Sequence, residues 1–525
     1  MNRAKQGNKT HTRGLKVAIG VPLLAMAAAV LAACGDGSSG SGGAAHVSVP
    51  NVAGDTQTAA TTAITGAGLK VGTLTQAMSS SIPKGDVVSE NPAAGSSVAS
   101  GSTVALVIST GPETYSIGGI LIGLGASATV HVLNGADDVP IAANGAFTLP
   151  TGVASGGNYG VTVGTPTSAQ TCAVQNGSGT AASGNITNVV VYCTYTVTAA
   201  TLNGTYTAAF AEFASPENGS PVAVDADIIA AYDGMGAYSG TSTVNNAGLI
   251  VPGYAVSGTY AVSTAGALPS LTNNSGAIGG IEGINGDSTV SVGMASGAAP
   301  GVAVAVLPNT SATTASINGN YTLVDLTAQL SNGSIYGYEA TITLTNGAIS
   351  GTYTQNIGGT ITTGNPASGQ WSVANGTVTA VGSALGAVSA DGDLIVLADT
   401  NSGDDPYINI AVLRGSGVTE ATFEGVYSVV EYGGTPVTAT FDKAITLFAY
   451  ANGTFSAVFT KNANGTITTN NTATGTYTVA TDGTMTLIDA EGDVYNGAIS
   501  ADGNALVLAS VASQQNPAIF VGVRQ

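Results

Sequence analysis

The sequence predicts a mainly β, multidomain protein that ends in three repeated β units. From residue 113 onward, short runs of alternating apolar and polar residues are interrupted by Gly, Asn and Pro, which is the pattern of half-buried strands. Asn-Gly and Asp-Gly pairs recur between these runs, and they are a strong hairpin signal because both turn residues need a positive φ. Only 8% of the 525 residues are charged, too few for long exposed helices that depend on Glu–Lys pairs.

The N-terminal segment, residues 1–33, has the composition of a secretory signal. Five basic residues and no acidic one accompany an apolar run that ends at Cys34. The ending LAAC resembles a bacterial lipobox, which implies that Cys34 carries a lipid and that the membrane is a partner through the lipidated N-terminus. An uncleaved anchor, or an ordinary signal with an incidental Cys, is the alternative. Residues 34–45 are rich in Gly and Ser and predict a flexible tether.

The residue after the lipobox bears on the destination of the chain. Gram-negative lipoproteins with Asp at this place are retained at the inner membrane, whereas this chain has Gly35. The resemblance therefore implies an outer-membrane or cell-surface protein rather than an inner-membrane one.

Residues 46–112 predict a small α+β module. Ala60, Ala63, Ile64 and Ala67 form one apolar stripe at helical spacing, and Gly68 is placed to end that helix. Three strand-like stretches follow, at residues 69–75, 86–89 and 103–109. The order of landmarks resembles a PASTA domain, the module of penicillin-binding proteins and bacterial Ser/Thr kinases. The landmarks are Pro50, Gly54, Gly68-Leu69, Pro83-Lys84-Gly85, Pro92-Ala93-Ala94-Gly95, Gly101-Ser102 and Ser109-Thr110-Gly111.

The PASTA resemblance implies association with uncrosslinked peptidoglycan or a muropeptide. The family often works through tandem copies, and some single copies serve only as spacers. Because this chain has one copy, a spacer role is the alternative.

Residues 113–197 predict a β-sandwich that resembles the small Ig-like repeats of bacterial surface lipoproteins, in the phrases ANGAF, QTCAVQNGSGT and NITNVVVYC. With Cys34 assigned to lipid, Cys172 and Cys193 remain as a pair. Two such residues in an exported protein predict a disulfide. A two-Cys metal site is the alternative, but neither Cys has a His nearby.

Three repeats follow, at residues 198–309, 310–415 and 416–525. They open with LNGTYT, INGNYT and FEGVYS and close with PGVAVAV, PYINIAV and PAIFVGV. Eight hairpin-linked strands per unit predict an up-and-down barrel, and the Gly-x-Tyr opening resembles the start of lipocalin-like barrels. A six-bladed propeller is the alternative, because GxYxV recurs at half a unit. Each unit is expected to bury its own core and to fold separately, with few contacts between units.

The residues that could carry catalysis are sparse. The chain has three His, none beside a candidate nucleophile, so no Ser-His-Asp set and no zinc site is predicted. A glycoside hydrolase needs only two carboxylates about 5–9.5 Å apart. The candidate pairs are Asp225 with Asp227, Glu282 with Asp287, and Asp391 with Asp393. The loop with Asp399, Asn401, Asp404 and Asp405 is a weak calcium candidate, and Trp371 is expected to pack in a core.

These observations favour a non-catalytic, lipid-anchored cell-envelope protein with a peptidoglycan-associating module and projecting β repeats for binding or spacing. No cofactor, no metal and no catalytic residue are predicted. A net charge of −19 argues against nucleic acid as a partner. A small-molecule binder using the barrel interiors is the main alternative, and a carboxylate-based glycoside hydrolase is a weaker one.

Overall fold

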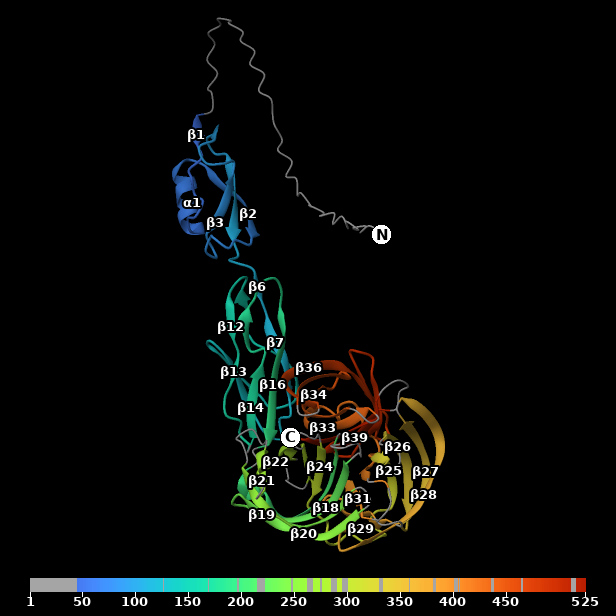
Figure 1. The fold of residues 1–525 in the computed structure, drawn as a ribbon. Helices are drawn as coiled ribbons and strands as arrows, with labels where there is room; N and C mark the ends of the chain where they lie inside the picture. Colours follow the sequence, from blue (N-terminus) through green and yellow to red (C-terminus); the bar gives the residue numbers. More distant parts are fainter. Residues whose placement is uncertain are drawn as a thin grey trace, which may run out of the picture. The chain divides into compact units, whose positions relative to one another are not determined.

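The computed structural model describes residues 45–525, with gaps at 126, 169, 196–197, 215–221, 247–248, 262–267, 274–275, 285–289, 295–300, 330–333, 358, 381–383, 401–404, 406, 436–438, 464–465 and 511–515. The predicted signal segment and Cys34 lie outside the described residues. The described chain is mostly strand, with a single α-helix, and divides into two compact units between Gly111 and Pro112 (Figure 1). The prediction of a mainly β, multidomain protein is confirmed.

The first unit packs helix α1 (Gln57–Gly66) on a small sheet. Strand β5 (Thr103–Ser109) lies between β2 (Lys70–Ala77) and β3 (Val87–Asn91), and β1 (His46–Ser48) pairs with β4 (Ser97–Ala99). The Thr56 side chain caps the helix by accepting a hydrogen bond from the Ala59 amide at 3.3 Å. Beyond the helix, Gly68 has the positive φ of +75° that was expected of it. The apolar stripe of α1 is buried through Ala60 and Ile64.

The second unit begins with a small β-sandwich. Its main sheet has the order β10-β7-β16-β14, and β13-β8-β9 form a second sheet. The bounds are β7 (Ile117–Ile122), β8 (Val130–Asn134), β9 (Asp137–Ile141), β10 (Gly145–Thr148), β13 (Thr162–Val163), β14 (Gln170–Gln175) and β16 (Ile186–Tyr195). Two short pairs complete it: β6 (Thr114–Tyr115) with β11 (Val153–Ala154), and β12 (Asn158–Gly160) with β15 (Ser178–Thr180). Cys172 and Cys193 form the expected disulfide, and it joins β14 and β16 within one sheet.

Each of the three repeats is a closed barrel of eight antiparallel strands. Barrel 1 contains β17 (Asn203–Ala214), β18 (Val222–Asp233), β19 (Ala237–Asn246), β20 (Leu249–Ala261), β21 (Leu268–Asn273), β22 (Gly276–Ile284), β23 (Val290–Met294) and β24 (Gly301–Val306). Barrel 2 contains β25 (Gly319–Gln329), β26 (Ser334–Thr345), β27 (Ala348–Ile357), β28 (Thr360–Ala374), β29 (Thr377–Ala380), β30 (Ala384–Val388), β31 (Leu394–Asp399) and β32 (Tyr407–Leu413). Barrel 3 contains β33 (Gly425–Thr435), β34 (Ala439–Tyr450), β35 (Thr454–Ala463), β36 (Thr466–Val479), β37 (Thr484–Asp489), β38 (Val494–Ile499), β39 (Ala505–Ser510) and β40 (Ala518–Arg524).

The first and last strands of each repeat pair with each other, so every barrel closes on itself: β17 with β24, β25 with β32, and β33 with β40. The propeller alternative is therefore wrong. The Asn-Gly turns of barrel 2 have the expected backbone, since Asn346, Gly347, Asn375 and Gly376 all have positive φ. In barrel 3 the expectation is wrong for the described turns: only the Gly has positive φ in Asn452-Gly453, Asp482-Gly483 and Asp502-Gly503.

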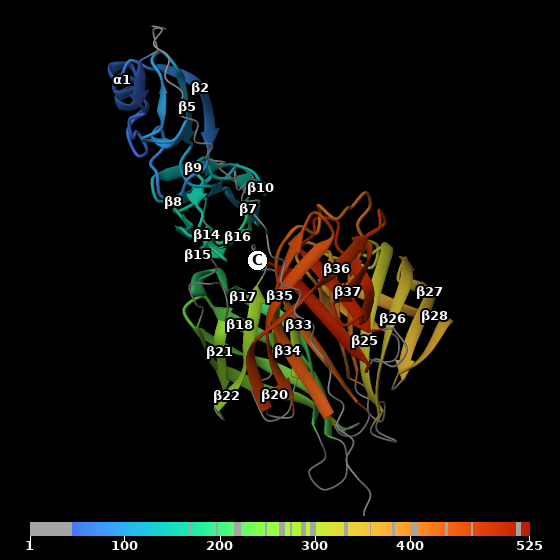
Figure 2. The ribbon, with the colours of Figure 1, turned by 90° about the horizontal axis from the view of Figure 1, so that it is seen from above.

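The expectation that few contacts join the barrels is wrong. Strands β17 and β18 contact β31, β25 and β26 contact β39, and β33 and β34 contact β23. Each barrel thus uses one side against the next barrel and another side against the previous one, and the third contact closes the ring. Figures 1 and 2 show the three barrels side by side in this arrangement.

The outward faces of these strands share one apolar core. Val292 and Val304 of barrel 1, Ile410 of barrel 2, and Val507 and Val521 of barrel 3 belong to it and are at most 1% exposed. Because β-strands alternate their side chains, the residues between these positions point into the barrels and form separate cores. The strands at the centre therefore read as continuous apolar runs, since they are buried on both faces.

Buried asparagines connect the barrels at equivalent places. The Asn245 side chain in β19 donates to Asp399 Oδ2 of barrel 2 at 2.9 Å, and that of Asn356 in β27 donates to the Ser510 carbonyl of barrel 3 at 3.1 Å. Both asparagines are fully buried. Hydrogen bonds in such places are directional, so they fix the register of one barrel against the next.

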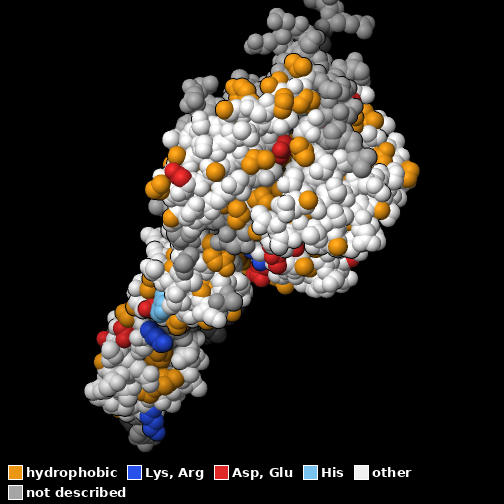
Figure 3. Space-filling model, turned by 90° about the horizontal axis from the view of Figure 1, so that it is seen from below, with side chains coloured by type: hydrophobic (Ala, Val, Ile, Leu, Met, Phe, Trp, Pro, Cys, Tyr) orange, Lys and Arg blue, Asp and Glu red, His pale blue; other side chains and the backbone are white. Residues whose placement is uncertain are grey.

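The sandwich packs against barrel 3, although barrel 1 follows it in the chain. Ile122 and Val190 of the sandwich form an apolar cluster with Val426 and Phe448 of barrel 3. Charged side chains are sparse on the molecular face drawn in Figure 3, as the composition implies. Within the described residues, no helix has the length and apolar character needed to cross a membrane.

Candidate ligand site in barrel 2

Barrel 2 contains a cavity of about 530 Å³. This volume falls within the range of small-molecule sites, roughly 300–1,000 Å³. Aromatic and small apolar side chains make most of the wall, and Gln355, Gln370 and Asn409 are among its polar members. Pro366 and Ser368 of β28 border the cavity and are also exposed, so the cavity reaches solvent along that strand.

Barrel 3 has the same topology but is filled. Its interior pocket measures about 70 Å³. Strand register matches Ala384 of barrel 2 to Tyr495 of barrel 3, and Asn409 to Phe520. The rings of Tyr495 and Phe520 meet edge to face with centroids 4.6 Å apart. Two aromatic rings thus occupy in barrel 3 the space that a methyl group and an amide leave open in barrel 2.

Asp325 on β25 is the buried acid of barrel 2. It is 1% exposed, and it accepts hydrogen bonds from Thr327 Oγ1 at 2.7 Å and from Asn409 Nδ2 at 3.1 Å. The hydroxyl of Tyr338 also donates to it. Burial raises the pKa of Asp325 to about 7, against the lowering effect of these three donors. Asp325 therefore titrates near neutral pH, at the side of the cavity that Tyr338 and Asn409 line.

Tyrosines surround the cavity beside this acid. Tyr336, Tyr338, Tyr353 and Tyr407 line it, and the rings of Tyr338 and Tyr353 lie with centroids 5.3 Å apart. Burial, with the charges of Asp325 and Asp405, raises the pKa of Tyr336 to about 12. Trp371 is 6% exposed, which agrees with the predicted core packing, and its ring also forms part of the cavity wall.

The carboxylate pairs proposed for a glycoside hydrolase do not border this cavity. Asp391 and Asp393 occupy the turn before β31, where Asp391 accepts hydrogen bonds from Ser389 and from the Asp393 amide. Burial, and the nearby Asp502 and Asp391, raise the pKa of Asp393 to about 7. The side chains of Asp225 and Glu282, and all of Asp287, lie outside the described residues. Asp227 is 6% exposed, and burial raises its pKa to about 6.

The acidic loop considered for calcium is described only in part. Asp399 is buried at the contact with barrel 1, where it accepts from Asn245. Asn401 and Asp404 lie outside the described residues.

Among the described residues, Asp489, Glu491 and Asp493 have carboxylate oxygens within 4.8 Å of one another. Sequence reasoning did not single out this cluster or Asp325, although an isolated acid in the apolar run YTLVDLTA was a usable signal for the latter.

The comparisons with known proteins concern the first unit most directly. The PASTA domain family matches residues 47–110. Residues 47–110 are a PASTA domain. No curated protein matches the chain.

Two solved structures are similar over parts of the chain. The extracellular region of the Ser/Thr kinase PrkC from Staphylococcus aureus is 24% identical, with a TM-score of 0.12, over 23% of this chain and 50% of that one, so the match spans half of the kinase region. A mutant of the vaccine antigen Transferrin Binding Protein B from Haemophilus parasuis is 11% identical, with a TM-score of 0.20, over 61% of this chain and 76% of that one.

Proposed function

We propose that this protein is an exported, non-catalytic envelope protein that associates with peptidoglycan through its PASTA domain and presents the sandwich and barrels as a binding module. The observation that carries the proposal is the PASTA match at residues 47–110. The basic, apolar and LAAC segments before the domain support export and lipid attachment at Cys34. The acidic composition supports attachment by lipid rather than by charge, since anionic lipids attract bases.

The wall-binding part of the proposal predicts a domain-specific pull-down. Residues 46–112 have a core of their own, formed by Val52, Ile64 and Leu106 among others, so this segment is expected to fold by itself. Purified peptidoglycan from the native host should retain the mature chain and residues 46–112, and should not retain residues 198–525. Equal retention of all three, or of none, would support the spacer alternative.

The lipid-anchor part of the proposal predicts loss of lipid labelling in Cys34→Ser. Cells expressing the wild-type chain should incorporate labelled palmitate into it, and the protein should fractionate with membranes. The variant should lose the label and leave the membrane fraction. Cys172→Ser is the matched control, because it removes a different Cys and should keep the label. Undiminished labelling of Cys34→Ser contradicts the proposal.

The cavity supports a second candidate function, which is the binding of a small molecule by barrel 2. The cavity volume of about 530 Å³ favours it over a purely structural barrel, because barrel 3 shows that the same fold can fill its interior. A barrel with a cavity of this size has fewer interior packing contacts than its filled neighbour. Calorimetric titration with ring compounds tests this function: the wild-type chain should release heat of binding, and a variant with bulkier side chains in the cavity wall should not.

A further inference from the structure

The buried acid of barrel 2 has a counterpart in barrel 3 that is paired with a cation. Glu431 on β33 lies opposite Lys443 on β34 in the strand register, and the Lys443 Nζ is 2.6 Å from Glu431 Oε2 inside the barrel. Both groups border the small interior pocket. In barrel 2, the same register places Tyr338 opposite Asp325. Barrel 2 thus keeps the acid and has a tyrosine where barrel 3 has its lysine.

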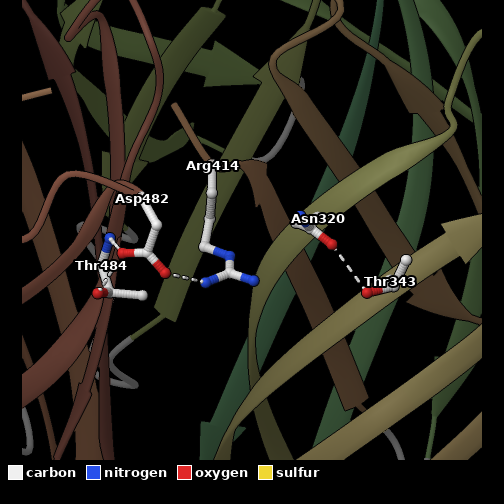
Figure 4. Close-up of polar contacts among 5 residues, drawn as sticks. All are labelled: Asn320, Thr343, Arg414, Asp482 and Thr484. Carbon is white, nitrogen blue, oxygen red and sulfur yellow. Dashed lines mark hydrogen bonds and ion pairs between the residues drawn. The ribbon is translucent and has the colours of Figure 1, made fainter. Parts of the chain in front are cut away.

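Barrel 2 has no other internal base that could replace that lysine. Between residues 310 and 415, Arg414 is the single basic residue of the sequence. Its guanidinium bonds to Asp482 Oδ2 of barrel 3 at 2.7 Å. Figure 4 shows it turned toward Asp482 and Thr484, beside a separate hydrogen bond between Asn320 and Thr343.

The position of Arg414 also separates it from the acid. Its backbone amide donates to the Asn320 carbonyl, near the start of β25. Asp325 is five residues farther along that strand, or about 17 Å at 3.4 Å per residue. The described residues that line the cavity include no charged side chain of either sign. Asp325 therefore has no basic side chain of barrel 2 beside it. It lies behind Tyr338 and Asn409, which form the cavity wall at this point.

The rings around that space suit a cation. Aromatic faces carry partial negative charge, and cages of tyrosine and tryptophan bind alkylammonium groups. Four tyrosines and Trp371 line the cavity. Leu323, Ile342 and Leu397 supply apolar wall for the rest of a ligand. An anion would be repelled by these ring faces and by the Asp325 carboxylate, and barrel 2 has no internal base to offset this repulsion.

We propose that barrel 2 binds an organic cation, a small molecule with an apolar body and one ammonium group, whose charge lies toward Asp325 in place of the lysine that barrel 3 carries. The proposal rests on the small-molecule function proposed for barrel 2 and specifies the charge class of its ligand. Tyr338 and Asn409 position Asp325, since both donate hydrogen bonds to it.

Three probes that share one ring and differ in charge test the proposal. They are 1-naphthylmethylammonium, the neutral 1-naphthalenemethanol and the anionic 1-naphthaleneacetate, titrated by calorimetry at pH 8 into the mature chain carrying Cys34→Ser. The cation should bind at least tenfold more tightly than the alcohol, and the anion should bind most weakly. Asp325→Asn should bring the ratio of cation to alcohol affinity close to one.

Two further variants locate the site and test the lysine comparison. Ala340→Phe with Ala367→Phe narrows the cavity and should abolish the heat of binding, whereas Ala473→Leu, at the position in barrel 3 equivalent to Ala367, should leave it unchanged. Tyr338→Lys gives barrel 2 the ion pair of barrel 3 and should reduce cation affinity at least tenfold. Circular dichroism of each variant establishes that it is folded.

The outcomes separate the ligand class from the function. If the alcohol or the acetate binds as tightly as the cation, and the cavity variant abolishes that binding, the cation proposal is wrong and the small-molecule function stands. If no probe releases heat, or if the cavity variant binds as the wild type does, both are wrong.

Discussion

Residues 416–525, expressed alone, are expected to aggregate, although they form a complete barrel. The barrel has its own interior core around Phe423, Tyr427 and Phe455. Its outer face also contributes residues such as Val430, Tyr432 and Val521 to the core shared with the other barrels. Removing the neighbours exposes this face to water, and an exposed contiguous apolar patch promotes association. Residues 198–525 together should remain soluble. Scanning calorimetry should show that they unfold in one transition.

A single charge introduced into the shared core should strongly destabilise the folded chain. Val521 is 1% exposed between barrels, so Val521→Asp in the full chain buries a carboxylate without a partner. We expect it to lower the free energy of unfolding by more than about 3 kcal/mol. Thr474→Asp places the same charge on an exposed strand of the same barrel and should change stability by no more than about 0.5 kcal/mol. Similar stability of the two variants, with a soluble 416–525 fragment, would indicate independent barrels.

The second large effect concerns pH. Asp325 has a raised pKa of about 7 in the folded chain, whereas an unfolded Asp titrates near pH 3.9. Between these values the folded state holds one proton more than the unfolded state. The stability contributed by this group is therefore complete below about pH 4 and is lost as the pH rises to 7, at up to about 1.4 kcal/mol per pH unit. Asp325→Asn should remove this part of the slope and leave the part contributed by Asp393, whose pKa burial also raises to about 7.

Trp371, the single Trp of the chain, lies in barrel 2 and follows its unfolding. Because the barrels are expected to unfold together, the contribution of Asp325 is the difference in slope between the wild type and Asp325→Asn. Guanidinium unfolding followed by Trp fluorescence at pH 5, 6 and 7 gives the slope for the wild type and the variant. Gln355→Leu is the matched control, since it alters the cavity wall without removing a titrating group, and it should keep the wild-type slope. A slope in Asp325→Asn equal to that of the wild type would show that Asp325 ionises normally.

Much of the barrel architecture could be predicted from local sequence. The Asn-Gly turns at Asn346 and Asn375 specify hairpins through a backbone that few other residue pairs adopt. Three copies of the same opening and closing phrases then give three equivalent units. The PASTA landmarks fix both the helix end at Gly68 and the order of strands around it.

The candidate site was harder to predict because it depends on residues that are distant in sequence. Whether a barrel is hollow depends on pairs such as Ala384 and Asn409 against Tyr495 and Phe520, and each member looks ordinary in its own strand. The importance of Asp325 comes from Tyr338 standing opposite it where barrel 3 has Lys443. That comparison becomes visible only when the strands are in register.

The sequence by itself determined the strands, the turns, the three-fold repetition and the PASTA domain, because each depends on interactions within a short stretch of chain. Only the tertiary structure decided that the barrels form one body with a shared core. The apolar runs that close the repeats, such as PYINIAV, are compatible with a strand covered by its own domain and equally with a strand covered by a neighbouring barrel. Alternation distinguishes one buried face from an exposed one, but a run buried on both faces does not show what covers it.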